Sequence, residues 1–579
     1  MERLFRISIL AFSMLLLTGI GSSISLDSLS VTWAYSRNEK EIQLLRQQNE
    51  GRLAEEYKVI PTTDQAVVFT FAGIANDEAL DDVLSRLDKM QVHATFFVFE
   101  NEAKLYTPAV QRILAAGHEI GVAIKPTKDA DFFKVSNEII RTMDFLKNRF
   151  DYEAKFIKQP WGQISDATKE AVSALGYTLI GQSVNVVQGK HKDYSNTGDV
   201  MKEIFGKYVY SLGRGQIVHF RMDYYSRSLL VGEMIEVIKK QKIDNIAYDF
   251  YDDNPRENIK NDSAYLIKSV GAVFDNLAKR YSYPVDDSLI PTLLKPTYRS
   301  FSLDNNNFKQ EMMKRYIGAP HVDEEDRTIG FNKREQRRLD QSGLIHQNEN
   351  VIFLTFDDWG NDSAINKLMY VLRKHQVVGT FFVITRNVNN NPNLLRSLAE
   401  QGHDIASHSE AHKPMAVRNE NNKYVSIQNF EEYYEDVGTA YQKLANIVGD
   451  VAVDGKYSLT RYFRPPTLAI SKEGMQAIYL NGYEYIVSGS CSTEDYAATS
   501  VSEVINNMQR GIYDRKTGIQ KGAVLVMHMS DTAVYTARAL DLLLTANEQR
   551  ADSDPLKFKV GRLADYLKDG YSQTRDISQ

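Results

Sequence analysis

Val351-Ile-Phe-Leu-Thr-Phe-Asp-Asp-Trp-Gly-Asn-Asp362 is a run of apolar residues and one threonine that ends in two adjacent carboxylates, Asp357 and Asp358. The apolar part is typical of a buried strand. Adjacent carboxylates repel each other, and a charge close to a core is costly unless it is paired. A metal cation is one candidate for the group that offsets this cost. Because successive strand residues point to opposite faces, both carboxylates can reach one site only if the chain leaves the strand at Asp357.

The same stretch has a counterpart earlier in the chain. VVFTFAGIAND from Val67 resembles it, ATFFVFENE from Ala94 matches GTFFVITRN from Gly379, and AAGHEIGVAIKP from Ala115 matches EQGHDIASHSEA from Glu400. All three pairs have the same separation, 285 residues, as from Ala94 to Gly379. Three matches at one separation indicate a tandem repeat.

Short β-branched or aromatic runs alternate with helical patterns inside each copy. In the second copy VIFLTF, VGTFFVI, HDIASH and GAVLVMH are typical of strands, and SAINKLMYVLRKHQ and NLLRSLAEQG are typical of helices. This alternation predicts an α/β fold with parallel strands, either a barrel or an open sheet. The polar residues then fall at the carboxyl ends of strands, where such folds place their active sites.

The polar residues at these strand ends occur in the second copy only. They are Asp357, Asp358, His408, His412, Arg464 and His528. The first copy has, in the same order, Ala72, Gly73, Ala123, Thr127, Lys158 and Arg221. If the fold required these side chains, the first copy would need them too. The set therefore indicates a function of the second copy, and the first copy is not expected to bind metal in this way.

Two histidines and one carboxylate can hold a cation and leave coordination positions open, which is the arrangement of a catalytic metal site. His408 and His412 stand four residues apart in HSEAH, a spacing that by itself is common on helix surfaces. An Asp-Asp pair alone is more often a cap or a turn. Together the two motifs gain force, because each ends an apolar strand of the same α/β unit. One Asp of the pair can bind metal while the other stays free as a base.

These residues resemble the motifs of the NodB-homology polysaccharide deacetylases, carbohydrate esterase family four. TFDDW resembles the first motif, in which the family has TFDDG, so Trp359 is a departure. HSEAH resembles the second motif and RYFRPP the third. Asp495-Tyr496 matches the fourth only loosely, and VLVMH resembles the fifth with Met529 in place of the customary aspartate.

The resemblance implies two tandem distorted (β/α) barrels of the polysaccharide deacetylase type, the first of them degenerate. It implies Asp357 as the catalytic base, oriented by Arg464, and His528 as the general acid. Asp358, His408 and His412 would bind a divalent metal, Zn²⁺ by the same resemblance, and Asp495-Tyr496 would line the acetyl pocket. The implied reaction is hydrolysis of N-acetyl groups of a cell-wall or extracellular polysaccharide.

Two other functions are compatible with the same residues. The same hydroxide attacks esters, so the protein could be an O-acetyl esterase on a plant or bacterial glycan. It could also be a non-catalytic glycan-binding envelope protein, as expected of the first copy. The weak fourth motif favours this last alternative, whereas the complete set of six polar residues argues against it.

The N-terminus predicts export. Arg3 and Arg6 precede an apolar run from Ile7 to Ile20, and Ala34-Tyr35-Ser36 is a plausible cleavage site. We interpret residues 1–36 as a signal peptide or signal anchor and expect a secreted or envelope-associated, extracytoplasmic protein. The chain then divides into a degenerate deacetylase-like domain at 57–250, an ordered connector at 251–344 and a catalytic domain at 345–570.

Composition excludes several other classes of site and partner. With one cysteine, Cys491, the chain can form neither an intramolecular disulfide nor a thiolate metal cluster. A net charge of −6 over 579 residues gives no support for a nucleic-acid partner, and no pattern specifies an oligomeric state. Among the other histidines, His118 and His403 occupy matching GH(D/E)I turns and are expected to be structural, and His375 is expected on a helix surface.

Overall fold

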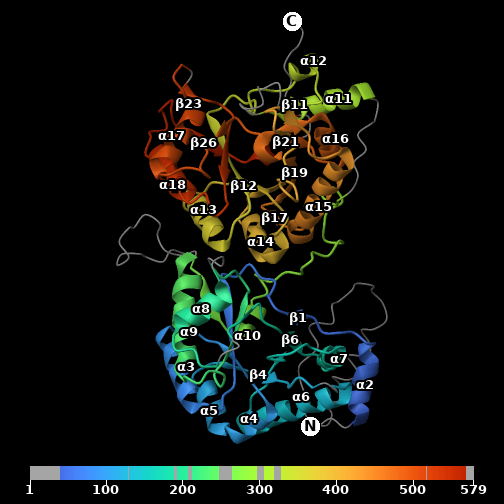
Figure 1. The fold of residues 1–579 in the computed structure, drawn as a ribbon, viewed down its shortest axis with the longest axis vertical. Coiled ribbons are helices and arrows are strands. Elements are labelled where there is room, and N and C mark those ends of the chain that lie inside the picture. Colours follow the sequence, from blue (N-terminus) through green and yellow to red (C-terminus); the bar gives the residue numbers. More distant parts are fainter. Residues whose placement is uncertain are drawn as a thin grey trace, which may run out of the picture.

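The computed structural model describes residues 39–127, 130–187, 192–206, 211–246, 264–296, 305–318, 328–516, 518–568 and 571. Figure 1 shows two stacked α/β lobes, the first running from blue to green and the second from yellow-green to red. The segment 1–36, interpreted as a signal peptide or anchor, lies outside the described residues. Within the described part of the chain, no helix has both the length and the apolar character needed to cross a membrane.

The first lobe is built on a nine-stranded sheet of parallel strands, in the order β1-β6-β5-β4-β3-β2-β8-β7, with β9 also pairing with β2. The strands are β1 (Glu56–Tyr57), β2 (Ala66–Ala72), β3 (Thr95–Val98), β4 (Glu119–Ala123), β5 (Phe156–Lys158), β6 (Thr178–Ile180), β7 (Val184–Asn185), β8 (Ile217–Arg221) and β9 (Leu266–Lys268). The α-helices around them are α2 (Glu39–Asn49), α3 (Asp77–Lys89), α4 (Glu100–Leu105), α5 (Thr107–Ala115), α6 (Phe132–Phe150), α7 (Asp166–Ala174), α8 (Thr197–Phe205), α9 (Leu230–Ile238) and α10 (Val270–Phe274).

The second lobe repeats this sheet in the order β10-β21-β19-β14-β13-β12-β25-β22, with β26 also pairing with β12. Its strands are β10 (Tyr316–Ile317), β12 (Val351–Asp358), β13 (Thr380–Val383), β14 (Asp404–Ser407), β19 (Leu459–Phe463), β21 (Tyr485–Val487), β22 (Cys491–Ser492), β25 (Ala523–His528) and β26 (Lys559–Gly561). Its α-helices are α11 (Asn305–Lys314), α12 (Lys333–Gln336), α13 (Asp362–Lys374), α14 (Pro392–Glu400), α15 (Phe430–Val448), α16 (Lys472–Leu480), α17 (Val501–Ile512), α18 (Thr536–Glu548) and α19 (Leu563–Tyr566). The matching strand orders confirm the prediction of two tandem domains of the (β/α) barrel type.

The central strand of each sheet explains the continuous apolar runs of the sequence. All seven residues of β2 are buried, and so are the first seven of β12. In β12, Ile352, Leu354 and Phe356 pack in the core that includes the surrounding helices, whereas Val351 and Phe353 pack with side chains of the other strands. The helix that follows begins in the same way in both domains. The side chains of Asn76 and Asn361 accept hydrogen bonds from the backbone N–H groups of Ala79 and Ala364, which satisfies otherwise unpaired groups at the helix start.

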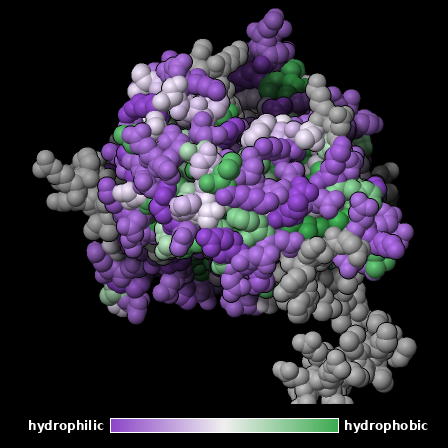
Figure 2. All heavy atoms as spheres, turned by 90° about the horizontal axis from the view of Figure 1, so that it is seen from below, coloured by the Kyte–Doolittle hydropathy of each residue, from purple (hydrophilic) through white to green (hydrophobic). Residues whose placement is uncertain are grey.

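The segment expected to be a connector contributes to both sheets. Leu266–Lys268 pairs with β2, whereas Tyr316–Ile317 pairs with β21. The described strands of this segment are thus built into the sheets of the two domains, and the expected domain boundaries remain a prediction. At the end of the first domain remote from the second, hydrophilic residues cover most of the surface, with hydrophobic ones interspersed among them (Figure 2).

Candidate metal and catalytic site

The predicted site residues meet at the carboxyl ends of four strands of the second sheet. Asp357 and Asp358 end β12, His408 follows β14, Arg464 follows β19 and His528 ends β25. A cavity of about 450 Å³ lies over these strand ends. Five of the six predicted residues line it, namely Asp357, Asp358, His408, His412 and His528. Arg464, the sixth, is fully buried and donates a hydrogen bond to Asp357.

A left-handed residue lets the two adjacent carboxylates reach the same cavity. Asp358 has φ of +79°, so the regular strand conformation ends after Asp357, as expected. In the first domain the matching residue is Gly73, with φ of +80°. A Cβ at Gly73 would lie 2.1 Å from Oδ1 of Asp223, so the space of the missing side chain is already filled. Trp359 packs against the core of the second domain and is not among the residues that line the cavity.

Asp358, His408 and His412 form a set of three possible metal ligands. One ligand atom from each lies within 4.8 Å of the others, and Nε2 of His412 is 3.7 Å from Oδ1 of Asp358. Nδ1 of His408 donates to the carbonyl oxygen of Arg464 at 2.8 Å, which leaves Nε2 with its lone pair toward the cavity. Burial, with a contribution from His412, lowers the pKa of His408 to about 3, so the ring is neutral as a ligand must be. This donor set fits a divalent cation such as Zn²⁺ and leaves positions open.

The loop that carries the two histidines is held by a residue that the motifs did not indicate. HSEAH lies in a loop rather than on a helix, with Ser409 and His412 at positive φ. The carboxylate of Asp436, on α15, accepts the backbone N–H groups of Glu410 at 3.0 Å and Ala411 at 2.9 Å. Asp436 lies 26 residues beyond Glu410, and no sequence pattern links it to the loop.

Arg464 orients Asp357 and supplies its countercharge. Nη1 of Arg464 donates to Oδ1 of Asp357 at 2.6 Å and to Oγ1 of Thr355 at 2.8 Å. Nε donates to the carbonyl of Val487, and the guanidinium lies 4.0 Å from the ring centre of Phe382. Burial raises the pKa of Asp357, and the positive charge of Arg464 opposes that rise. The carboxylate is thus a stronger base than an exposed aspartate, with one oxygen fixed and the other turned toward His408.

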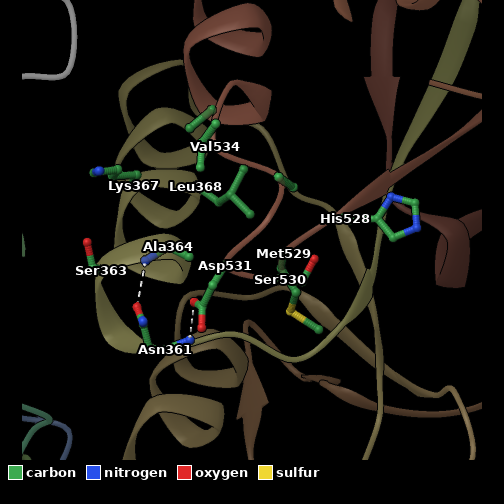
Figure 3. Close-up of a pocket in the computed structure, with 12 residues that line it drawn as sticks. Asn361, Ser363, Ala364, Lys367, Leu368, His528, Met529, Ser530, Asp531 and Val534 are labelled. Atoms are coloured by element: carbon green, nitrogen blue, oxygen red, sulfur yellow. Dashed lines mark hydrogen bonds between the residues drawn. The ribbon is translucent and has the colours of Figure 1, made fainter. Parts of the chain in front are cut away.

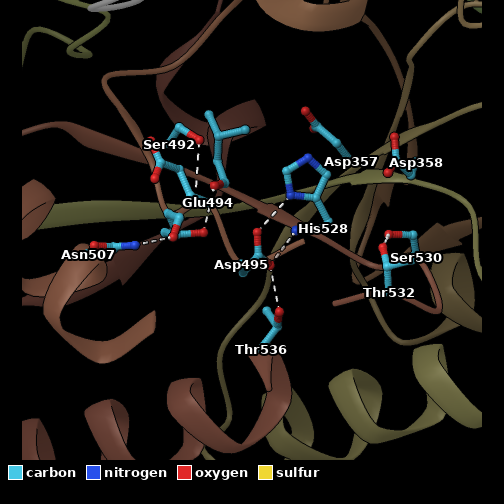
Figure 4. Close-up of polar contacts among 12 residues, drawn as sticks. Asp357, Asp358, Ser492, Glu494, Asp495, Asn507, His528, Ser530, Thr532 and Thr536 are labelled. Carbon is cyan, nitrogen blue, oxygen red and sulfur yellow. Dashed lines mark hydrogen bonds and ion pairs between the residues drawn. The ribbon is translucent and has the colours of Figure 1, made fainter. Parts of the chain in front are cut away.

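Hydrogen bonds to the carboxylate of Asp495 fix the position of His528 (Figure 4). Its Oδ1 bonds Nδ1 of His528 at 2.7 Å, and its Oδ2 accepts the backbone N–H of His528 at 2.8 Å and the hydroxyl of Thr536 at 2.5 Å. Burial favours neutral His528, but the hydrogen bond and charge of Asp495 outweigh burial and raise the pKa of the imidazole. Asp495 is fully buried and does not line the cavity, contrary to expectation. Tyr496 does line it, with its ring centre 4.9 Å from that of His528.

A smaller cavity of about 190 Å³ adjoins His528 on the side of α13 (Figure 3). Leu368 and Lys367 line it from the helix, and Ser530 and Val534 line it from the chain after β25. Within the described residues, the Lys367 amine makes no hydrogen bond or ion pair, and burial lowers its pKa.

His118, His403 and His375 make contacts within the scaffold. Nδ1 of His403 accepts the N–H of Gly379 at 3.3 Å, and Nδ1 of His118 accepts the matching N–H of Ala94 at 3.4 Å, so the structural interpretation of this pair is confirmed. The expectation for His375 was wrong. Its side chain is buried, and its ring nitrogens contact Asp541 at 2.5 Å and Glu548 at 2.7 Å, both on α18.

Comparisons with known proteins agree with this architecture. Residues 60–180 and 345–486 match the family model of the polysaccharide deacetylases. The peptidoglycan-N-acetylglucosamine deacetylase PgdA of Listeria monocytogenes is 29% identical over 198 residues, which is 34% of this chain and 35% of that protein. The peptidoglycan-N-acetylmuramic acid deacetylase PdaA of Bacillus subtilis is 25% identical over 235 residues, which is 37% of this chain and 80% of that protein.

A solved structure was also matched, the Xyl-CE4 domain of a multidomain xylanase from the hindgut metagenome of Trinervitermes trinervoides. It is 22% identical, with a TM-score of 0.29, and the match covers 38% of this chain and 90% of that one. The chain thus spans about a third of the length of PgdA but most of the length of PdaA. From the two matched segments and the repeated strand order, the chain carries two tandem domains of the polysaccharide deacetylase family, of which the first is degenerate.

Proposed function

We propose that the second domain is a metal-dependent deacetylase that hydrolyses N-acetyl groups of a cell-wall or extracellular polysaccharide. One observation carries the proposal. A carboxylate paired with a buried arginine, a set of three metal-ligand side chains and a histidine paired with a carboxylate all converge at one cavity. A base, a metal site and an acid are the groups that amide hydrolysis requires.

The side chains divide the reaction between the two sides of the cavity. Asp357, with Oδ1 held by Arg464, uses its other oxygen to accept a proton from the water that attacks the acetamide carbon. A divalent cation held by Asp358, His408 and His412, Zn²⁺ in our proposal, would supply Lewis acidity to the water and the carbonyl oxygen.

His528 completes the reaction at the leaving group. Its Nδ1 is fixed by Asp495, so Nε2 is the atom that protonates the departing amine as the carbon–nitrogen bond breaks. The products are acetate and a free amino sugar. One proton has been taken up by Asp357 and one given by His528, so the two groups exchange a proton through solvent before the next turnover.

The substrate class rests on the named activities of the relatives. PgdA and PdaA are named as deacetylases of peptidoglycan amino sugars, and a relative from Azorhizobium caulinodans is named as a chitooligosaccharide deacetylase. We propose an acetylated amino-sugar polymer as the partner and an extracytoplasmic place of action.

Acetate release tests this function. The zinc-loaded full chain is offered peptidoglycan, chitooligosaccharides and O-acetylated xylan, and the same protein stripped with a chelator is the comparison. We expect zinc-dependent acetate release from at least one N-acetylated polymer and little from the xylan. Release from xylan alone would establish the O-acetyl esterase instead. If zinc-loaded protein releases nothing from any polymer but binds one of them, it acts as a glycan-binding protein.

Asp495→Asn should move the alkaline limb of the kcat–pH profile to lower pH. Asp495 raises the pKa of His528, and a general acid works only while it is protonated, so removing this negative charge lowers the pH at which activity is lost. We expect a shift of about one pH unit or more. Thr536→Val is the control. The Thr536 hydroxyl donates to the same carboxylate, so this variant removes a hydrogen bond of Asp495 but leaves its negative charge in place. An unchanged limb in Asp495→Asn would show that His528 is not the acid.

A further inference from the structure

A buried carboxylate of the second domain is bonded by side chains of the first. Asp362, the first residue of α13, is 3% exposed and follows Asp358 by four residues. Its Oδ1 accepts the hydroxyl of Tyr265 at 2.5 Å and lies 3.7 Å from Nη1 of Arg214. Its Oδ2 accepts Nδ2 of Asn391 at 2.5 Å. Tyr265 and Arg214 stand just before β9 and β8, so both belong to the sheet of the first domain.

These side chains form a connected polar cluster at the domain border. Arg214 is 2% exposed and donates to the hydroxyl of Tyr265 at 2.5 Å and to Oδ1 of Asn366 at 2.9 Å. Asn366 in turn donates to the same hydroxyl at 2.9 Å. The Tyr265 hydroxyl therefore accepts two hydrogen bonds and donates one, which uses its full capacity. Buried polar groups joined in this way hold a single geometry, because any displacement leaves a group unpaired.

A second contact shows that the two domains fit together over more than one point. Nδ2 of Asn393, near the start of α14, donates to the carbonyls of Ile60 at 2.9 Å and Arg214 at 2.7 Å. Its Oδ1 accepts the N–H of Thr62 at 3.1 Å and the hydroxyl of Tyr281 at 2.7 Å. Asn393 belongs to α14 and not to a loop that carries catalytic residues. Its hydrogen bonds therefore hold the two domains together without involving the Asp357–Asp358 segment.

The Asp362 cluster, in contrast, is directly continuous with the candidate site. Between Asp358 and Asp362 the chain has three residues, and the N–H of Asn361 donates to Asp531 at 3.0 Å. A Cβ at Gly360 would lie 2.2 Å from the carbonyl oxygen of Met529, so this loop is packed tightly against the chain that follows His528. The loop after the two aspartates is thus fixed on one side by the His528 segment and at its end by the first domain.

We propose that the first domain positions the Asp357–Asp358 segment, through Tyr265 and Arg214 acting on Asp362. The degenerate domain is then part of the working site rather than a spacer or a separate glycan-binding module. Tyr265 and Arg214 are positioning residues, since neither reaches the cavity. The inference rests on the proposed function for its effect on catalysis, but its effect on metal affinity is independent of the substrate.

Tyr265→Phe in the full chain tests the proposal, with Tyr281→Phe as the matched control. Each variant removes one hydroxyl that donates across the domain border, the first to Asp362 and the second to Asn393. The primary measurement is zinc affinity by titration against a competing chelator, together with the melting temperature. We expect Tyr265→Phe to bind zinc about tenfold more weakly, and Tyr281→Phe to bind it as the wild type does. Where a substrate is known, kcat should fall in Tyr265→Phe with KM little changed.

Asp362→Asn, made in the second domain, supplies the second variant and should reproduce the loss of zinc affinity. If both tyrosine variants bind zinc like the wild type, or both lose affinity equally, the first domain does not position the segment through this cluster. If the wild type binds zinc but releases no acetate, the proposed function fails while the zinc titration still decides the present proposal.

Discussion

Asp357→Asn should lower kcat for acetate release by about 10³-fold while zinc affinity changes little. The substitution keeps the size of the side chain and one oxygen for Arg464, but an amide cannot take a proton from the attacking water. Because the three ligand atoms belong to Asp358, His408 and His412, the metal site should survive. The measurements are kcat from acetate release and zinc binding by titration.

Asp404→Asn is the matched control. Asp404 is also a fully buried aspartate on a parallel strand, and its Oδ1 accepts Nε of Arg562 at 2.6 Å. It is the first residue of β14, at the amino end of that strand, and it does not line the cavity that Asp357 lines. We expect this variant to lose stability and to keep kcat within about threefold of the wild type. Equal losses of kcat in the two variants would point to general unfolding and against a base at Asp357.

Arg464→Met should have the largest effect on stability. Arg464 is fully buried and donates to Asp357, Thr355 and the carbonyl of Val487. Methionine keeps much of the apolar stem but leaves the carboxylate of Asp357 buried without its countercharge. Removing one partner of such a pair costs about 3–5 kcal/mol of unfolding free energy, measured by denaturant titration.

The double variant Arg464→Met/Asp357→Asn separates charge from packing. If the loss comes from an unpaired carboxylate, neutralising that carboxylate should recover part of the stability, so the double variant should be more stable than Arg464→Met alone. An additive or greater loss in the double variant would mean that packing of Arg464 on Phe382 and its bonds to Thr355 and Val487 dominate instead.

Sequence patterns predicted the fold well because the relevant signals are local and repeated. Apolar runs bounded by helical patterns identified β12, β13, β14 and β25, and the constant separation of the two copies indicated the tandem arrangement. The site residues could be predicted from the sequence for the same reason. Parallel strands bring their carboxyl ends to one edge, so polar residues at four strand ends had to converge.

Contacts between distant side chains carry no such pattern. Asp495 lies 33 residues before His528, and only its loose motif marked it, with no indication that it would bond the imidazole rather than line the cavity. His375 was misplaced because its burial depends on the packing of α18 against α13, which helical periodicity in one segment does not report. The bond from Tyr265 to Asp362 spans 97 residues and depends on how two separately patterned domains dock.

The bend at Gly73 also bears on how the first domain could be repaired. Its backbone still takes the conformation that Asp358 uses, but Asp223, ion-paired with Arg221, occupies the space beside it. Gly73→Asp alone would therefore collide with Asp223, whereas Asp223→Ala opens the space first. The two substitutions are therefore epistatic. Gly73→Asp is harmful while Asp223 is present and can supply a ligand only after Asp223→Ala. Metal binding would further require histidines in place of Ala123 and Thr127, so the first domain has kept the shape of the scaffold but lies several substitutions away from a metal site.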